Sequence, residues 1–323
     1  WQDEAHLMRL QRGAPLVSLN ADSRTDTRIK RKSALVSVQA RSFAQNPVER
    51  AIVAERVTMP GKLTIRSLQS VDDFLACEEI QRQVWGPGDA EVVPLNLLMA
   101  VAHNGGLALG AFSNGQLIGF VFGFLGASDR PGPEAPAAAR LKHHSHMLAV
   151  LPGWRDAGVG YALKLAQREA ALAQALPWMT WTYDPLQSRN ALFNIAKLGA
   201  VCCTYYRDYY GPMRDELNAG LPSDRFQVDW RMAGDRVAAR LSGQGARLAR
   251  AHYAGAGADL LNPASFDSMR SQPYPRPAET LARLETPLAL VEIPADFQPL
   301  RRADQGLALA WRKTFVSASR AMR

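Results

Sequence analysis

The stretch Ser145–Ala170 reads SHMLAVLPGWRDAGVGYALKLAQREA. Its apolar run Met147–Val150 is typical of a buried strand, and Pro152 and Gly153 end that strand. A run of good helix formers begins right after Gly160. A strand that turns through glycines into a helix start gathers unpaired backbone N–H groups and the positive end of the helix dipole at one point. We therefore predict that this segment binds a pyrophosphate.

The spacing of the glycines decides which kind of phosphate site this is. Gly158-x-Gly160 is too short for the dinucleotide fingerprint, and no Lys-Ser or Lys-Thr pair follows as a P-loop requires. The segment Arg155–Gly160 instead resembles the Arg/Gln-x-x-Gly-x-Gly/Ala signature of the GNAT acyl-CoA N-acyltransferases. An ordinary strand–helix turn is the alternative interpretation. The resemblance implies that coenzyme A contacts Leu148, Val150, Arg155, Ala157, Gly158, Gly160, Tyr161 and Asn190.

The order of the predicted elements agrees with this resemblance. The Asn114-Gly115 pair between two apolar runs is a strong hairpin signal, and Ser70 is a good helix N-cap. The predicted elements are, in order, a strand at 63–66, helices at 70–84 and 95–103, strands at 107–113 and 116–125, the phosphate-loop strand and helix, a strand at 178–183 and a helix at 190–197. GNAT enzymes have this order, so the resemblance implies an α/β (α+β) fold with a mixed, mostly antiparallel twisted sheet flanked by helices.

Later motifs extend the resemblance to roughly residues 62–232. The segments WTYDPLQSRNALFNIAKLGA (181–200) and DELNAGLPSDRFQVDW (215–230) are similar to a group of GNAT acyltransferases that carry the same short elements in the same order.

The chain of 323 residues is predicted to have three parts. Residues 1–58 are a basic leader that we expect to be disordered, because they lack sustained periodicity and the apolar core of a secretory signal. A nucleic-acid-binding arm around Arg28–Lys32 is the less favoured alternative. Residues 59–232 are the predicted GNAT domain. Residues 233–323 are a C-terminal extension that packs on this domain or completes it, with a strand at 288–293 and a helix at 307–315.

Composition excludes several classes of protein. No apolar run of the length needed to cross a bilayer occurs, so we expect no membrane partner. The cysteines Cys77, Cys202 and Cys203 show no metal-ligand spacing, which argues against a zinc site and a disulfide framework and favours the cytoplasm. The net charge of +8 suits a polyanionic ligand such as coenzyme A, while nucleic acid is not favoured as a partner.

N-acyl transfer needs a base that removes a proton from the attacking amine. In many GNAT enzymes this is a carboxylate early in the strand before the phosphate loop, where this chain has Lys142-His143-His144-Ser145-His146. Alternation along a strand places His144 and His146 on one face and His143 on the other. We predict that His144 or His146 is the base, since histidine titrates near neutral pH, although backbone-bonded structural histidines are the alternative. Asp184 and Glu91 are reserve candidates; the Asp184-Pro185 pair is equally explained as a turn.

The family pattern fails at the acid that protonates the leaving thiolate. GNAT enzymes often place a tyrosine four residues before the glycine that ends the last core helix, but counting back from Gly199 gives Ile195. The thiolate therefore leaves without an acid, or a tyrosine among Tyr205, Tyr206, Tyr209 and Tyr210 replaces it. Packing in a strand is the other role open to these tyrosines.

Arg225 and Tyr206 are the predicted substrate contacts. An arginine binds a carboxylate through two parallel hydrogen bonds, which suits an amino acid or an acyl group that carries a carboxylate. A structural Asp224-Arg225 pair in the turn after Pro222 is the alternative.

Together these features predict an acyl-CoA-dependent N-acyltransferase. It would move an acetyl, succinyl or other short acyl group from coenzyme A to a small-molecule amine by direct attack, with no metal. A non-catalytic acyl-CoA sensor on the same fold is the main alternative, and the sequence leaves a homodimer open.

Overall fold

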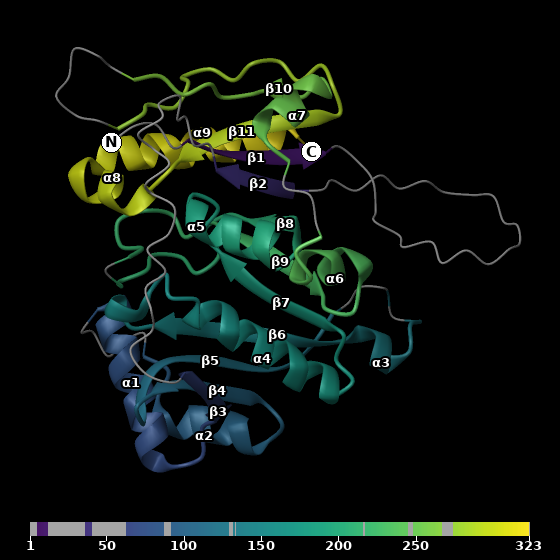
Figure 1. Ribbon diagram of the computed structural model, residues 1–323. Coiled ribbons are helices and arrows are strands. Elements are labelled where there is room, and N and C mark those ends of the chain that lie inside the picture. The colour runs from purple at the N-terminus through teal and green to yellow at the C-terminus, as the bar shows by residue number, and fades with distance from the viewer. Residues whose placement is uncertain are drawn as a thin grey trace, which may run out of the picture.

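The computed structural model describes residues 5–11, 36–40, 63–86, 92–128, 132, 134–215, 217–244, 248–266 and 274–322 (Figure 1). Two features named above, the reserve base Glu91 and the basic cluster Arg28–Lys32, lie outside the described residues.

Seven of the described strands form one sheet. Its order is β3-β4-β5-β6-β7-β9-β8, and β6 and β7 are its parallel pair, whereas the other neighbours are antiparallel. The strands are β3 (Leu63–Ser67), β4 (Leu107–Ser113), β5 (Gln116–Ala127), β6 (Leu141–Val150), β7 (Trp178–Tyr183), β8 (Val201–Tyr206) and β9 (Arg225–Arg231). The predicted fold class, a mixed and mostly antiparallel sheet flanked by helices, is confirmed.

Local sequence signals explain the first elements. Ser70 caps α1 (Val71–Trp85) in a reciprocal capping box with Asp73. Asn114 and Gly115 both have positive φ, as a tight hairpin turn requires, and join β4 to β5.

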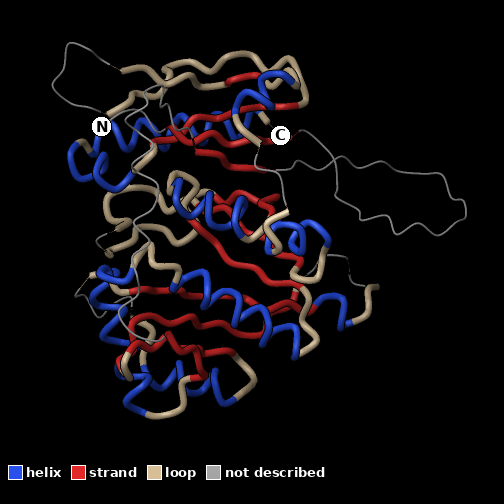
Figure 2. The backbone as a smooth tube through the Cα atoms, in the orientation of Figure 1, coloured by secondary structure: helices blue, strands red, loops and turns tan. Residues whose placement is uncertain are grey.

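Helices cover both faces of this sheet (Figure 2). On one face, α4 (Val159–Ala173) buries Val159 and Leu163 against β4 and β5. On the other face, α1 and α2 (Leu95–His103) bury Phe74 and Leu98 among phenylalanines of β5. Short helices lie in the connections: α3 (Ala137–Arg140), η3 (Pro152–Trp154), and α5 (Ser188–Ala191), which continues as a π-helical turn, η4 (Leu192–Lys197).

Four further described strands form a second sheet, with the order β10-β11-β1-β2. They are β1 (Ala5–Gln11), β2 (Val36–Ala40), β10 (Asp259–Leu260) and β11 (Leu288–Pro294). In the two parts of the leader that are described, the chain is therefore extended and paired, with β1 antiparallel to β11, where disorder was expected. The rest of the leader lies outside the described residues.

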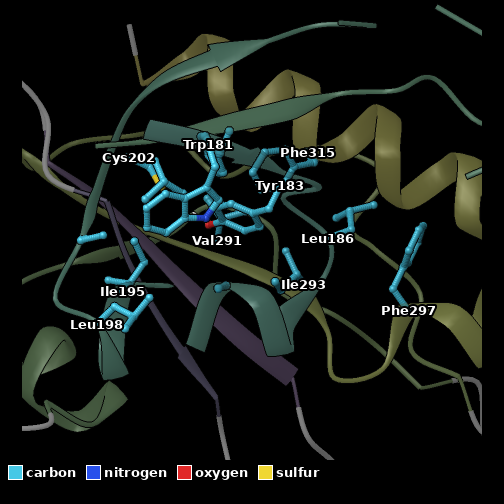
Figure 3. Close-up of a cluster of buried hydrophobic side chains, with 14 of the residues drawn as sticks. Trp181, Tyr183, Leu186, Ile195, Leu198, Cys202, Val291, Ile293, Phe297 and Phe315 are labelled. Atoms are coloured by element: carbon cyan, nitrogen blue, oxygen red, sulfur yellow. Dashed lines mark hydrogen bonds between the residues drawn. The ribbon is translucent and has the colours of Figure 1, made fainter. Parts of the chain in front are cut away.

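The C-terminal helices are α6 (Asp235–Leu241), α7 (Arg250–Gly255), α8 (Phe297–Ala303) and α9 (Gln305–Ala321). One buried cluster joins α6, α8 and α9 to the first sheet, because Tyr183 of β7, Val291 of β11 and Phe315 of α9 belong to the same core (Figure 3). The segment 233–323 thus shares its core with the sheet that carries the phosphate loop.

Candidate functional site

The two parallel strands of the first sheet separate along their length. Among the described residues, β6 and β7 pair at His143–Met179 and His144–Thr180. Beyond these pairs β6 continues to Val150 beside β5, while β7 pairs with β9 on its other side. The two strands therefore form a split that is closed at Thr180 and opens toward the phosphate loop.

Backbone groups of β6 line this split. The N–H of Leu151 donates to the carbonyl oxygen of Ile118 in β5 at 2.9 Å. Since N–H groups alternate in direction along a strand, those of Leu148 and Val150 point away from β5, toward the split. Their side chains pack with the α4 side of the sheet.

The split leads to the start of α4. Gly158 adopts the left-handed conformation with φ +84°, and no side chain caps the helix. The first backbone bond of the helix runs from the N–H of Ala162 to the carbonyl of Gly158 at 3.0 Å, so the three preceding N–H groups, Val159 to Tyr161, have no partner within the helix. This is the geometry of a helix N-terminus that accepts a phosphate.

The other predicted coenzyme contacts lie around this helix start. Arg155 is next to the split, where its Nε donates to the carbonyl oxygen of Val150 at 3.4 Å. Asn190 is exposed on α5. Its neighbour Arg189 forms an ion pair with Asp156, and this pair ties α5 to the phosphate loop. The structure therefore brings the predicted positions of both segments to the mouth of the split.

His144 and His146 lie on one face, as the alternation predicts. Their ring centroids are 6.2 Å apart, and both rings contact Phe124. A bulge leaves His146 without a partner in β5, since Met147 pairs with Phe122 and Ser145 pairs with Gly123. Strand alternation keeps both imidazoles on the α1–α2 side, and the bulge places the side chains of Leu148 and Val150 on the opposite side.

The surroundings of the two imidazoles differ. His144 is half-buried, and its Nδ1 lies 3.3 Å from Oγ1 of Thr180. Burial, and to a smaller extent the nearby His146, lowers the pKa of His144 to about 4. His146 is exposed, but the rings of Phe122 and Phe124 shield one side, and this desolvation lowers its pKa. Both side chains are therefore neutral near pH 7, as a proton acceptor must be.

His143 occupies the opposite face and is fully buried. Its Nε2 lies 3.0 Å from the side-chain nitrogen of Gln167 in α4. Burial, reinforced by Lys164, lowers its pKa to about 3. Because it is buried under α4, the imidazole of His143 is neutral near pH 7 and has a structural role.

Asp184 follows β7 but does not face the split with a free carboxylate. Both of its oxygens accept hydrogen bonds from Arg312 of α9, and one also accepts from the N–H of Leu186. Burial raises the pKa of this carboxyl, but the paired guanidinium outweighs burial and holds the pKa below its ordinary value. This arrangement favours a structural role over that of a base.

The predicted substrate residues lie on the same sheet face as His144 and His146. The hydroxyl of Tyr206 donates to Gln227 at 3.1 Å, and its ring stacks on Tyr209 with centroids 4.8 Å apart. Tyr210 follows, with its hydroxyl 3.2 Å from Oγ1 of Thr182 in β7. Arg225 is buried beneath this group and donates to the backbone oxygen of Asp224 and to Asn218.

Two polar residues at the split belong to none of the motifs in the sequence. Thr180 holds His144, and Lys164 of α4 is buried between β6 and β7. Alternation in the strand could have placed Thr180 on the face of His144. The helical spacing of Lys164 four residues after Gly160 could have placed it on the inner side of α4.

Among the described residues no group of three or more His, Cys, Asp or Glu side chains is arranged to hold a metal ion, and no described helix is long and apolar enough to span a membrane. Cys77 and Cys202 are buried, and Cys203 is exposed.

No protein-family model matches this chain, and no curated protein matches it in sequence. Solved structures resemble it weakly. The ribosomal-protein-S18-alanine N-acetyltransferase from Escherichia coli is 18% identical over 54% of this chain and 97% of its own, with a TM-score of 0.40. An N-acetyltransferase from Staphylococcus aureus is 15% identical over 53% and 99%, with a TM-score of 0.41. The PaiA N-acetyltransferase from Thermoplasma acidophilum, in complex with coenzyme A, is 18% identical over 53% and 99%, with a TM-score of 0.34.

Proposed function

We propose that this protein is an acyl-CoA-dependent N-acyltransferase that transfers an acetyl or other short acyl group to a small-molecule amine. The observation that carries the proposal is the split between β6 and β7, which runs directly to the uncapped start of α4. An extended thioester chain fits between two separating strands, and a pyrophosphate fits the helix N-terminus at the end of that path.

In this proposal the donor lies on the α4 side of the split. The pyrophosphate accepts hydrogen bonds from the first N–H groups of α4, and Arg155 adds positive charge at the mouth. The thioester carbonyl lies beside the backbone N–H of Leu148 or Val150. A fixed N–H in this place stabilises the negative charge that develops on the carbonyl oxygen during attack.

The amine approaches from the opposite face, where His144 and His146 lie. We assign the base to His146, because it is the more exposed imidazole and is closer along β6 to Leu148. It removes the proton directly or through one water, the amine nitrogen attacks the carbonyl carbon, and the carbon–sulfur bond breaks. Thr180 holds His144 beside it.

No tyrosine is in the expected position to protonate the leaving thiolate, because that position is occupied by Ile195. This side chain is buried in the core. Since a thiol has an ordinary pKa of about 8.5, the thiolate can leave as an anion and take its proton from water.

The amine-side surface is formed by Tyr206, Tyr209 and Tyr210. We place Tyr206 in contact with the substrate and give Arg225 a supporting role, because its donors are already bound to Asp224 and Asn218. Its guanidinium carbon lies 5.3 Å from the ring centroid of Tyr210.

The proposal is tested by free-thiol release from acyl-CoA donors of several chain lengths, each with pools of amino acids or polyamines. Release that requires both a donor and one amine pool supports it. A non-catalytic sensor, favoured by Ile195, would show thermal stabilisation by coenzyme A without release. If coenzyme A causes no thermal stabilisation and no thiol is released, the segment 155–160 is not a pyrophosphate site.

A further inference from the structure

An ion pair joins α5 to the phosphate loop at the mouth of the split. Nη2 of Arg189, on α5, donates to Oδ1 of Asp156, in the turn before α4. The two residues are 33 positions apart in sequence, and both side chains are largely exposed. An exposed pair of this kind contributes little to the stability of a fold. The pair therefore matters most for the helix start beside it, where the pyrophosphate is proposed to bind.

Asp156 is the one acidic residue of the segment 155–160. Its backbone has φ +65°, a left-handed conformation that aspartate tolerates better than most residues. It comes two residues before Gly158, the N-cap of α4. A carboxylate near a helix start is attracted to the first N–H groups and is a common cap. It is also an anion beside a site proposed to bind another anion, so its charge opposes binding of the ligand.

Arg189 keeps this carboxylate away from the helix. No side chain caps α4, and the Asp156 carboxylate is bound to the Arg189 guanidinium instead. The N–H groups of Val159 to Tyr161, which have no partner within the helix, are therefore not capped by Asp156. The ion pair also affects the charge of the loop. With Asp156 neutralised by Arg189, the positive charge of Arg155 remains within the segment 155–160; without Arg189, Asp156 would cancel it.

The position of Arg189 is fixed from the C-terminal side of the chain. The buried hydroxyl of the preceding residue, Ser188, donates to the carbonyl oxygen of Ala295, just before α8. The next residue, Asp296, also acts on the guanidinium. The hydrogen bond with Asp156, followed by the charges of Asp156 and Asp296, raises the pKa of Arg189 despite its partial burial. The guanidinium thus interacts with two carboxylates of its own chain, which leaves less of its charge for a ligand.

We propose that Arg189 is a positioning residue for the acyl-CoA donor: it holds the Asp156 carboxylate away from the start of α4 and neutralises its charge, so that the pyrophosphate can bind there. This inference rests on the proposed function, which places the pyrophosphate at this helix start. It differs from direct binding of a phosphate by Arg189. Because Arg189 acts through Asp156, its effect disappears when the carboxylate is removed.

A double-variant cycle tests this inference, with coenzyme A binding to the full chain measured by titration calorimetry. Arg189→Met should weaken binding about threefold to tenfold, the effect of one uncompensated charge near an anion in an exposed setting. Asp156→Asn should bind coenzyme A at least as tightly as the unaltered chain, since asparagine also tolerates the left-handed backbone. The double variant should bind within about twofold of the unaltered chain. A double variant as weak as Arg189→Met would show that Arg189 contacts the ligand directly and would overturn the inference.

The outcomes also separate this inference from the proposed function. If the unaltered chain binds coenzyme A and Arg189→Met binds it equally well, only the inference fails. If the unaltered chain does not bind coenzyme A, the proposed function fails and the inference falls with it. Thermal unfolding without coenzyme A should be nearly the same for all four proteins, because an exposed ion pair contributes little to stability.

Lys197→Met is the matched control, because Lys197 is exposed on η4, which continues α5, and the variant loses the same charge. It should bind coenzyme A nearly as well as the unaltered chain, and a loss equal to that of Arg189→Met would contradict the inference. Ionic strength gives a second control. Between about 0.01 M and about 1 M salt the screening length falls from about 30 Å to about 3 Å. The difference between Arg189→Met and the unaltered chain should therefore disappear at high salt; a difference that persists would contradict an electrostatic role.

Discussion

Asp184 and Arg312 form a two-point ion pair, with both oxygen–nitrogen distances at 2.7 Å and both side chains buried. The pair joins the end of β7 to α9, which lie 128 residues apart in sequence. It fixes the C-terminal layer against the strand that forms one side of the split. The carboxylate that seemed available for catalysis in the sequence thus has a counter-ion in the fold.

Removing only the arginine should be costly. Arg312→Met leaves the Asp184 carboxylate buried without a counter-ion, and we expect a loss of about 3–5 kcal/mol in the free energy of unfolding. Adding Asp184→Asn should restore part of this loss, because the neutral amide can still accept from the N–H of Leu186. Urea denaturation of both single variants and the double variant measures the coupling. Simple additivity of the two losses would contradict the assigned pairing.

The sequence predicts the parts of the site that depend on local chemistry. The turn before α4 is visible in the sequence because Gly158 adopts a conformation that other residues rarely adopt, and the hairpin is visible in Asn114-Gly115 for the same reason. The shared face of His144 and His146 follows from strand alternation.

Features that depend on contacts distant in sequence were not predictable. No local pattern shows that Asp184 meets Arg312, or that Phe315 of α9 packs on Tyr205 of β8 and Phe226 of β9. The bulge at His146 is set by the pairing of β6 with β5, so the sequence does not show that Leu148 faces the other side. A lysine in an amphipathic helix is usually exposed, and only the packed structure shows that Lys164 is buried.

Activity should depend on His146 more than on His144. His146→Gln removes the proposed base and should lower kcat about 100-fold or more, with little change in KM for the donor. His144→Gln should have a smaller effect, since it acts beside the base. For the unaltered protein, kcat should rise with pH through the lowered pKa of His146, below 6.5, and then level off. Equal losses in both variants would contradict the assignment.

Acid should destabilise the fold through His143. Its pKa is about 3 in the folded state and near 6.5 when unfolded, so the unfolded chain binds more protons between these values. Stability should therefore be full above pH 6.5 and fall as the pH drops, by up to about 1.4 kcal/mol per pH unit. Urea midpoints at pH 7 and pH 5 measure this slope. His143→Gln should reduce it, whereas His103→Gln at an exposed position should not; an unchanged slope in His143→Gln would rule out this source.

The two glycines of the phosphate loop should respond differently to alanine. Gly158 has φ +84°, so Gly158→Ala should cost about 1 kcal/mol of stability through backbone strain, even though its Cβ would meet nothing within 4 Å. A Cβ at Gly160 would make ordinary contacts with Leu148 at 3.5 Å and Val150 at 3.8 Å, so Gly160→Ala should fold as well as the unaltered chain.

Coenzyme A binding should separate the same two variants. Strain at residue 158 turns the first N–H groups of α4 away from the pyrophosphate, so Gly158→Ala should lower the affinity for coenzyme A. Gly160→Ala leaves these groups in place and should bind nearly as well as the unaltered chain. Thermal unfolding with and without coenzyme A measures both effects. A Gly158→Ala variant that binds coenzyme A with full affinity would show that the pyrophosphate does not lie at this helix start.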